Sequence, residues 1–182
     1  MGKKNPGSNW APSLWLVLSS LLCFAALALP SSSPNSIMSL KWMLLPEASK
    51  SISTLEVMMD RDIDSNCVRK PGSHTRNLLR VKRGIDMVRV LFEQIVASEG
   101  NSLKDAASKA YAQVLAPHHG WAIRKAVGAG MYALPTKSQL LKKLNEDEVS
   151  AKIQMQNYIA SSIPVIIYID KLFNSRKLGI NW

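Results

Sequence analysis

The stretch Arg69–Ile95, RKPGSHTRNLLRVKRGIDMVRVLFEQI, decides the fold because it carries one long helical pattern. At about 100° per residue, its apolar side chains fall on a single stripe, which is the spacing of a helix that packs on a core. The residues on this stripe are Leu78, Val81, Ile85, Val88, Phe92 and Ile95. Pro71-Gly72 and Gly100 break the pattern on either side. The sequence therefore predicts a long helix that faces a core.

The opposite side of this helix changes from cationic to apolar along its length. The cationic part consists of Arg76, Arg80 and Arg83, and the apolar part of Met87, Val90 and Leu91. This layout suits an anionic headgroup attached to a hydrocarbon tail. Two plainer interpretations stay open, because arginines at helical spacing are commonly a solvated face and a helix apolar on both sides is commonly a central core helix.

The composition is that of a globular protein with a strong positive charge. Its 182 residues are 47% hydrophobic and 20% charged, and the formal net charge is +10. Such a charge favours anionic partners, among them membrane surfaces, phospholipids and nucleic acid. We expect no nucleic-acid partner, because the sequence has no zinc-finger spacing, no aromatic RNA-stacking signature and no long basic arm. An acidic lipid is the favoured ligand.

Residues 1–46 differ from the rest of the chain and are predicted to lie outside the folded domain. Two lysines precede an apolar run from Leu14 to Leu29, which a Ser/Pro-rich segment follows. This pattern is typical of a signal peptide or a short anchor, and a poorly ordered appendage is the alternative. The predicted domain covers residues 47–182.

Two cysteines, Cys23 and Cys67, give no disulfide framework, so a reducing compartment fits the body of the chain. We therefore expect a cytoplasmic protein that is peripheral to membranes. A membrane-anchored or secretory protein is the alternative, if residues 13–30 act as a signal or an anchor.

Helical patterns fill residues 47–182, and no segment alternates convincingly like a half-buried strand. Further helices are predicted over residues 51–64, 102–115, 118–134 and 137–144, with a last long helix from about residue 146 onward. Pro164 is expected to disturb that last helix. The apolar tail Leu178–Trp182 is expected to dock on the domain. The predicted fold class is all-α.

No pattern of catalytic or metal-binding residues stands out. His118 and His119 are adjacent, so they point to different sides of a helix, and the i, i+4 spacing of HExxH is absent. A nucleophile motif, a P-loop and a dinucleotide fingerprint are absent as well. We expect no enzymatic activity, no cofactor and no metal site.

Three motifs carry a resemblance to a known family: RNLLRVKRG at 76–84, PHHGW at 117–121 and MYALPTK at 131–137. With these motifs in this order, residues 47–182 resemble the glycolipid transfer protein superfamily, in its ceramide-1-phosphate branch. The resemblance implies a two-layer, all-α sandwich that holds one sphingolipid and moves it between membranes without catalysis. It also implies transient contact with membranes, a monomer, and a link to sphingolipid-controlled cell death in plants.

The resemblance implies roles for particular residues. Arg76 and Arg80 would bind the lipid phosphate, since each guanidinium offers forked donors to phosphate oxygens. His119 would contact the ceramide amide. Arg80 stands where glycolipid-binding relatives carry a tryptophan platform for sugar, which favours ceramide-1-phosphate over glycosylceramide. The residues expected to line the chain pocket, which equally suit a plain core, are Met87, Val90, Leu91, Val127 and Met131.

The chain departs from the family upstream of Glu47. The family carries an aspartate and, in this branch, a lysine on its second helix, and neither has a counterpart in a matching motif here. Without the first two family helices the sandwich would expose apolar surface, so we expect weaker stability and reduced transfer. The alternative is a truncated, non-transferring member that binds anionic membranes or a protein partner through its basic helix.

Overall fold

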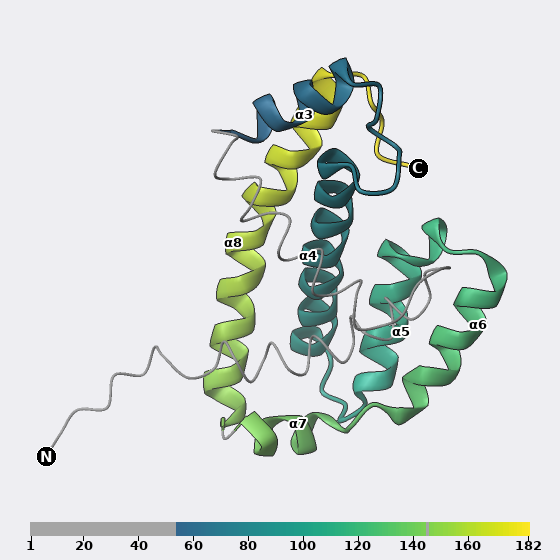
Figure 1. Ribbon diagram of the computed structural model, residues 1–182. Coiled ribbons are helices and arrows are strands. Elements are labelled where there is room, and N and C mark those ends of the chain that lie inside the picture. The colour runs from purple at the N-terminus through teal and green to yellow at the C-terminus, as the bar shows by residue number, and fades with distance from the viewer. Residues whose placement is uncertain (1–53, 145) are drawn as a thin grey trace, which may run out of the picture.

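The computed structural model describes residues 54–144 and 146–182, and in this part of the chain the regular structure is helical, without strands. The long helix α4, His74–Ala97, runs through the middle, with α8, Glu148–Ser175, on one side and α5, Leu103–Val114, on the other (Figure 1). The remaining α-helices are α3, Leu55–Asp64, α6, Trp121–Gly130, and α7, Lys137–Leu144. The predicted all-α class is confirmed.

Helix α4 begins at a network of polar side chains that also holds the end of α3. The Ser73 hydroxyl accepts a hydrogen bond from the Arg76 amide at 3.1 Å and donates one to the Asp62 carboxylate at 2.7 Å. That carboxylate also accepts from the Thr75 amide at 2.7 Å. Gly72, with φ of +90°, makes the turn before the cap. The helix therefore starts two residues after Gly72, where the proline and glycine of the sequence indicated a break.

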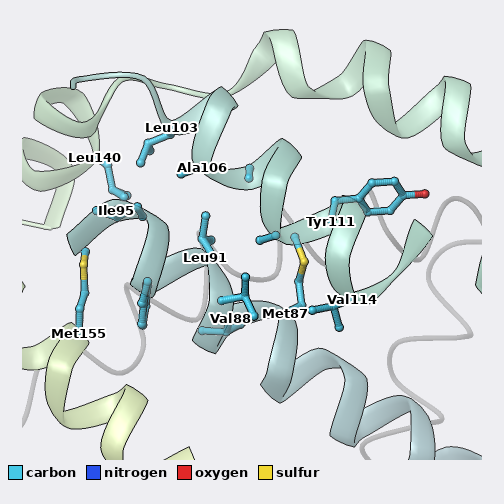
Figure 2. Close-up of a cluster of buried hydrophobic side chains, with 14 of the residues drawn as sticks. Met87, Val88, Leu91, Ile95, Leu103, Ala106, Tyr111, Val114, Leu140 and Met155 are labelled. Carbon is cyan, nitrogen blue, oxygen red and sulfur yellow. The ribbon is translucent and has the colours of Figure 1, made fainter. Parts of the chain in front are cut away.

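The apolar residues of α4 are buried on two sides, which makes it a central core helix. Its second half joins α5, α7 and the start of α8 in one cluster, which contains Met87, Leu91, Ile95, Leu103, Leu140 and Met155 among others (Figure 2). Its first half packs with α3 and the end of α8 in a second cluster around Met59, Leu79 and Phe173. Val81 and Ile85, predicted on the buried stripe, are only partly buried.

The predicted helix over residues 118–134 is wrong, because two short 3₁₀ turns flank a shorter α-helix there. Ala116–His118 forms the first turn, α6 covers Trp121–Gly130, and Met131–Ala133 forms the second turn. His119 is extended, with φ of −113° and ψ of 136°, and Gly120 is the N-cap of α6. Pro117 starts only a 3₁₀ turn, so the helical ladder does not continue into α6.

The expected disturbance at Pro164 is also wrong, because α8 continues through it to Ser175. Proline removes one backbone donor, which leaves the carbonyl four residues earlier without its helical partner. Both Pro164 and Ala160 are exposed, so water can satisfy that carbonyl. The tail behaves as predicted, since Leu178, Ile180 and Trp182 pack against the second cluster.

Among the described residues, no helix combines the length and the apolarity that a membrane crossing requires. The apolar run from Leu14 to Leu29, and with it the predicted signal or anchor, lies outside the described residues.

We predict that Asp62→Ala lowers the free energy of unfolding by about 2 kcal/mol, because the buried Thr75 amide loses its partner. Burial alone would raise the pKa of Asp62, but hydrogen bonds from Thr75 and Ser73 outweigh it and lower that pKa. The measurement is urea denaturation followed by circular dichroism. Asp64→Ala, an exposed position on the same helix, is the control, and equal losses for both variants would contradict the prediction.

Candidate functional site

The cationic end of α4 is partly buried instead of lying fully in solvent. Arg76, Arg80 and Arg83 all keep an intermediate exposure. Burial lowers the pKa of Arg80, and the charge of Arg76 lowers it further. The pKa of Arg83 is lowered in the same way by burial and by Arg80. The three guanidinium groups still carry their charge at any physiological pH, so they form one patch of mutually repelling cations.

Two arginines elsewhere in the described helices are paired with acids, whereas Arg76 and Arg80 are not. Arg89 contacts Asp86 at 2.7 Å on the same helix, and Arg176 contacts Asp60 at 2.6 Å. Among residues 54–144 and 146–182, no aspartate or glutamate forms an ion pair with Arg76 or Arg80. Partly buried cations without acidic partners are unfavourable by themselves, and an anion bound beside them would relieve this.

The C-terminal tail holds the third arginine. Nη2 of Arg83 donates to the backbone oxygens of Ile180 and Trp182, each at 2.7 Å. The Trp182 ring lies against Phe173, and the guanidinium carbon of Arg69 lies 5.2 Å from its centre. The tail therefore joins the α3–α4 connection to the arginine patch.

His119 lies close to the same patch, although it comes from the loop after α5. Burial lowers the pKa of His119, and the charge of Arg83 adds to the effect, so the two side chains are near enough to interact. Nδ1 of the ring is 2.9 Å from the hydroxyl oxygen of Tyr111. The extended conformation of His119, between the 3₁₀ turn and Gly120, brings the ring back to α5. A continuous helix through this loop would have placed the ring differently.

The five residues predicted for the chain pocket lie together. Met87, Val90, Leu91, Val127 and Met131 are all buried in the first apolar cluster. They come from α4, from α6 and from the 3₁₀ turn after it. This cluster is formed by the half of α4 that follows the arginines, so the cationic and apolar parts adjoin along one helix. Their role as a pocket lining stays a prediction, because the same burial suits a core.

Two contacts at this site were not found from the sequence. Tyr111 has no local spacing rule that links it to His119, eight residues later. The tail carbonyls lie 97 and 99 residues from Arg83. The only signal was that a buried tyrosine or a partly buried arginine requires a hydrogen-bond partner.

Comparison with known proteins shows the family to which this chain and its fold belong. The family model described as glycolipid transfer protein matches residues 35–146. The chain belongs to the glycolipid transfer protein family, whose members are lipid transfer proteins. The predicted family and its helical sandwich fold are thereby confirmed.

Individual relatives are plant proteins with similar sequence and structure. The chain is 71% identical to "Accelerated cell death 11" of Arabidopsis thaliana over 139 residues, which are 76% of this chain and 68% of that protein. It is 49% identical to the "ACD11 homolog protein" of the same plant, over 76% of this chain and 60% of that one. A crystal structure of a mutant of Arabidopsis accelerated cell death 11, complexed with C12 ceramide-1-phosphate, matches with a TM-score of 0.80 and 57% identity, and covers 99% of this chain and 90% of that one.

We predict that Trp182→Ala destabilises the protein by about 1–2 kcal/mol, because the partly buried indole loses its contact with Phe173 and its cation–π interaction with Arg69. Urea denaturation measures the loss. Asn181→Ala, an exposed neighbour, is the matched control, and a Trp182→Ala midpoint equal to wild type would show that the tail is not docked.

We predict that the melting temperature falls as the pH drops from about 7.5 to about 5.5. Burial and the charge of Arg83 lower the pKa of His118 and His119 in the folded state. Unfolded histidines, with a pKa of about 6.5, take up protons that the folded rings resist, so acid favours unfolding. The pKa of the buried carboxylate Asp62 is lowered, so its contribution is lost only at more acidic pH.

Calorimetry at both pH values measures this effect. The double variant His118→Gln/His119→Gln should show a smaller drop than wild type, whereas His74→Gln, a single histidine at the start of α4, should show the wild-type drop. An unchanged drop in the double variant would assign the acid sensitivity to other groups.

Proposed function

We propose that this chain binds a phosphorylated sphingolipid, ceramide-1-phosphate, and transfers it between membranes without covalent change. One observation carries the proposal: Arg76 and Arg80 form a partly buried cationic pair that lacks an acidic partner in the described part of the chain. His119 interacts with Arg83, which follows Arg80 on the same helix, and an apolar cluster adjoins the arginines along α4.

The arginine pair suits a phosphate monoester better than a neutral sugar. Residues at i and i+4 of a helix are neighbours, so Arg76 and Arg80 can face one phosphate group from the same side. Each guanidinium offers two parallel donors to two phosphate oxygens. A sugar would leave both charges without compensation, which predicts selectivity for the phosphorylated lipid.

His119 and the apolar cluster suit the rest of a ceramide. A ring N–H beside the arginines can donate to the amide carbonyl next to the headgroup. The hydrocarbon chains would enter between Met87, Val90 and Leu91 of α4 and the side chains of Val127 and Met131. These five side chains are apolar and lie together, and pockets for lipids are lined in this way.

We also propose that the surface formed by α6 and the turn after it makes transient contact with a membrane. Trp121 is 70% exposed and Tyr132 is 76% exposed, at either end of α6 and its following turn. Lys104 lies over the Tyr132 ring at 3.6 Å. Aromatic side chains beside cations are typical of surfaces that meet lipid headgroups. We also propose that the protein acts as a cytoplasmic monomer.

The similar proteins support this proposal by what they are known to bind. The Arabidopsis structure that matches with 57% identity was solved with C12 ceramide-1-phosphate. More distant relatives, 29% identical, are the ceramide-1-phosphate transfer proteins of zebrafish and rat. The residues that carry the site, Arg76, Arg80 and His119, fall inside the 35–146 family match.

The test is transfer of fluorescent ceramide-1-phosphate between vesicles. We predict that Arg80→Ala and His119→Ala each slow transfer about tenfold or more, because each removes a hydrogen bond to a charged or amide group of the ligand. Wild type should transfer galactosylceramide far more slowly than ceramide-1-phosphate.

Arg89→Ala is the matched control, since it removes a guanidinium from the same helix that already has acidic partners. It should transfer like wild type. If wild type transfers no lipid but binds any anionic vesicle in a salt-sensitive way, the chain is a non-transferring member that contacts membranes through its basic helix, and the proposal fails.

A further inference from the structure

We propose that Tyr111 is a positioning residue that fixes the imidazole of His119 in its Nε2–H tautomer, so that the ring presents one N–H donor to an acceptor beside the arginine patch. The inference rests on the proposed function in one respect, because the acceptor it names is the amide carbonyl of a sphingolipid.

The geometry of the pair is that of a hydrogen bond with little freedom. The Tyr111 hydroxyl oxygen lies 2.9 Å from Nδ1 of His119, and the ring centres are 5.7 Å apart at an angle of 41°. Tyr111 is only 7% exposed, so the packing of α5 holds its ring in place. Figure 2 shows its hydroxyl pointing away from the aliphatic cluster, at the end of a ring that projects from α5. The hydroxyl is thus a fixed point on which the histidine can be oriented.

The protonation of both groups supports a hydrogen bond that the tyrosine hydroxyl donates to the ring. Burial raises the pKa of Tyr111, with Arg124 acting weakly against it, so the hydroxyl keeps its proton at neutral pH. Burial and Arg83 lower the pKa of His119, which favours a neutral ring with one N–H. Among the described residues the Tyr111 hydroxyl has His119 as its hydrogen-bond partner, so donating to Nδ1 uses its proton.

When the Tyr111 hydroxyl donates to Nδ1, that nitrogen is the acceptor and carries no proton. The single proton of the neutral ring then lies on Nε2, at the opposite edge of the imidazole. The reverse tautomer would turn Nδ1 into a donor and leave the tyrosine proton without this acceptor. It would also present a bare nitrogen, which cannot donate to a carbonyl or to a phosphate oxygen. Tyr111 therefore determines whether His119 acts as a donor, without contacting the ligand itself.

The first test is nitrogen-15 NMR of histidine-labelled full-length protein at about pH 7.5, where the ring is neutral. The wild-type His119 should show one protonated and one unprotonated nitrogen, with the proton on Nε2. In Tyr111→Phe, which keeps the ring and its packing, the two nitrogens should move toward an average of both tautomers. The His119 signals are assigned from their loss in His119→Gln.

Tyr158→Phe is the matched control. Tyr158 is another partly buried tyrosine, and its hydroxyl donates to the Ile85 carbonyl at 3.3 Å, far from His119 in the sequence. This variant should leave the His119 signals unchanged. A wild-type proton on Nδ1, or identical His119 signals in wild type and Tyr111→Phe, would overturn the inference, since a merely structural tyrosine would not set the tautomer.

The second test is vesicle transfer of fluorescent ceramide-1-phosphate by the same variants. We expect Tyr111→Phe to slow transfer about threefold to tenfold, which is the effect of weakening one hydrogen bond, and Tyr158→Phe to leave it near wild type. Wild-type transfer with no loss in Tyr111→Phe would overturn the role in ligand binding. A wild-type protein that shows the Nε2–H tautomer but transfers nothing would support the positioning by Tyr111 and refute the proposed function.

Discussion

The burial of α4 between α5 and α8 is the constraint on which the rest of the structure depends. A helix covered on two sides must be apolar on both, yet the first half of α4 also carries three arginines and Lys82. Lys82 is 8% exposed and is neutralised by Asp170 of α8 at a distance of 3.0 Å. The arginines differ from Lys82, because no acid on a neighbouring described helix is paired with them. A buried ion pair such as that of Lys82 with Asp170 does more to fix which helices meet than to stabilise them.

The neighbouring arginines repel one another and the charge of Arg83 disfavours protonation of His119, so the site is a unit and not a set of independent groups. Bringing guanidinium groups close together in a partly buried place raises the free energy of the unliganded protein, and an anion lowers it again. Binding of an anion therefore gains from repulsion that folding has already introduced. Burial of the two apolar clusters, one at each half of α4, stabilises the fold enough to offset this repulsion.

The parts of the fold that follow local rules could be predicted from the sequence. The 3.6-residue period located α4, and the helices predicted over residues 102–115 and 137–144 agree closely with α5 and α7. The break after Pro117 was missed because proline is equally compatible with the first turn of a longer helix. Pro164 was judged by its missing donor alone, whereas solvent exposure decides whether that loss matters. Tyr111 and the tail carbonyls were missed because their contacts depend on tertiary packing, which periodicity does not describe.

The contacts around the arginine patch differ greatly in sequence separation, which is the difference in residue number between the two partners. The α4–α5 packing joins neighbours in sequence, whereas the bonds of Arg83 to the tail close loops of 97 and 99 residues, and that of Arg176 to Asp60 closes one of 116. Long loops cost more entropy to close, so such contacts form late in folding. The chain can thus collapse around α4 and α5 first, while its cationic end stays open and hydrated. The arginine patch takes its final form only when α8 docks and the tail that follows it reaches Arg83.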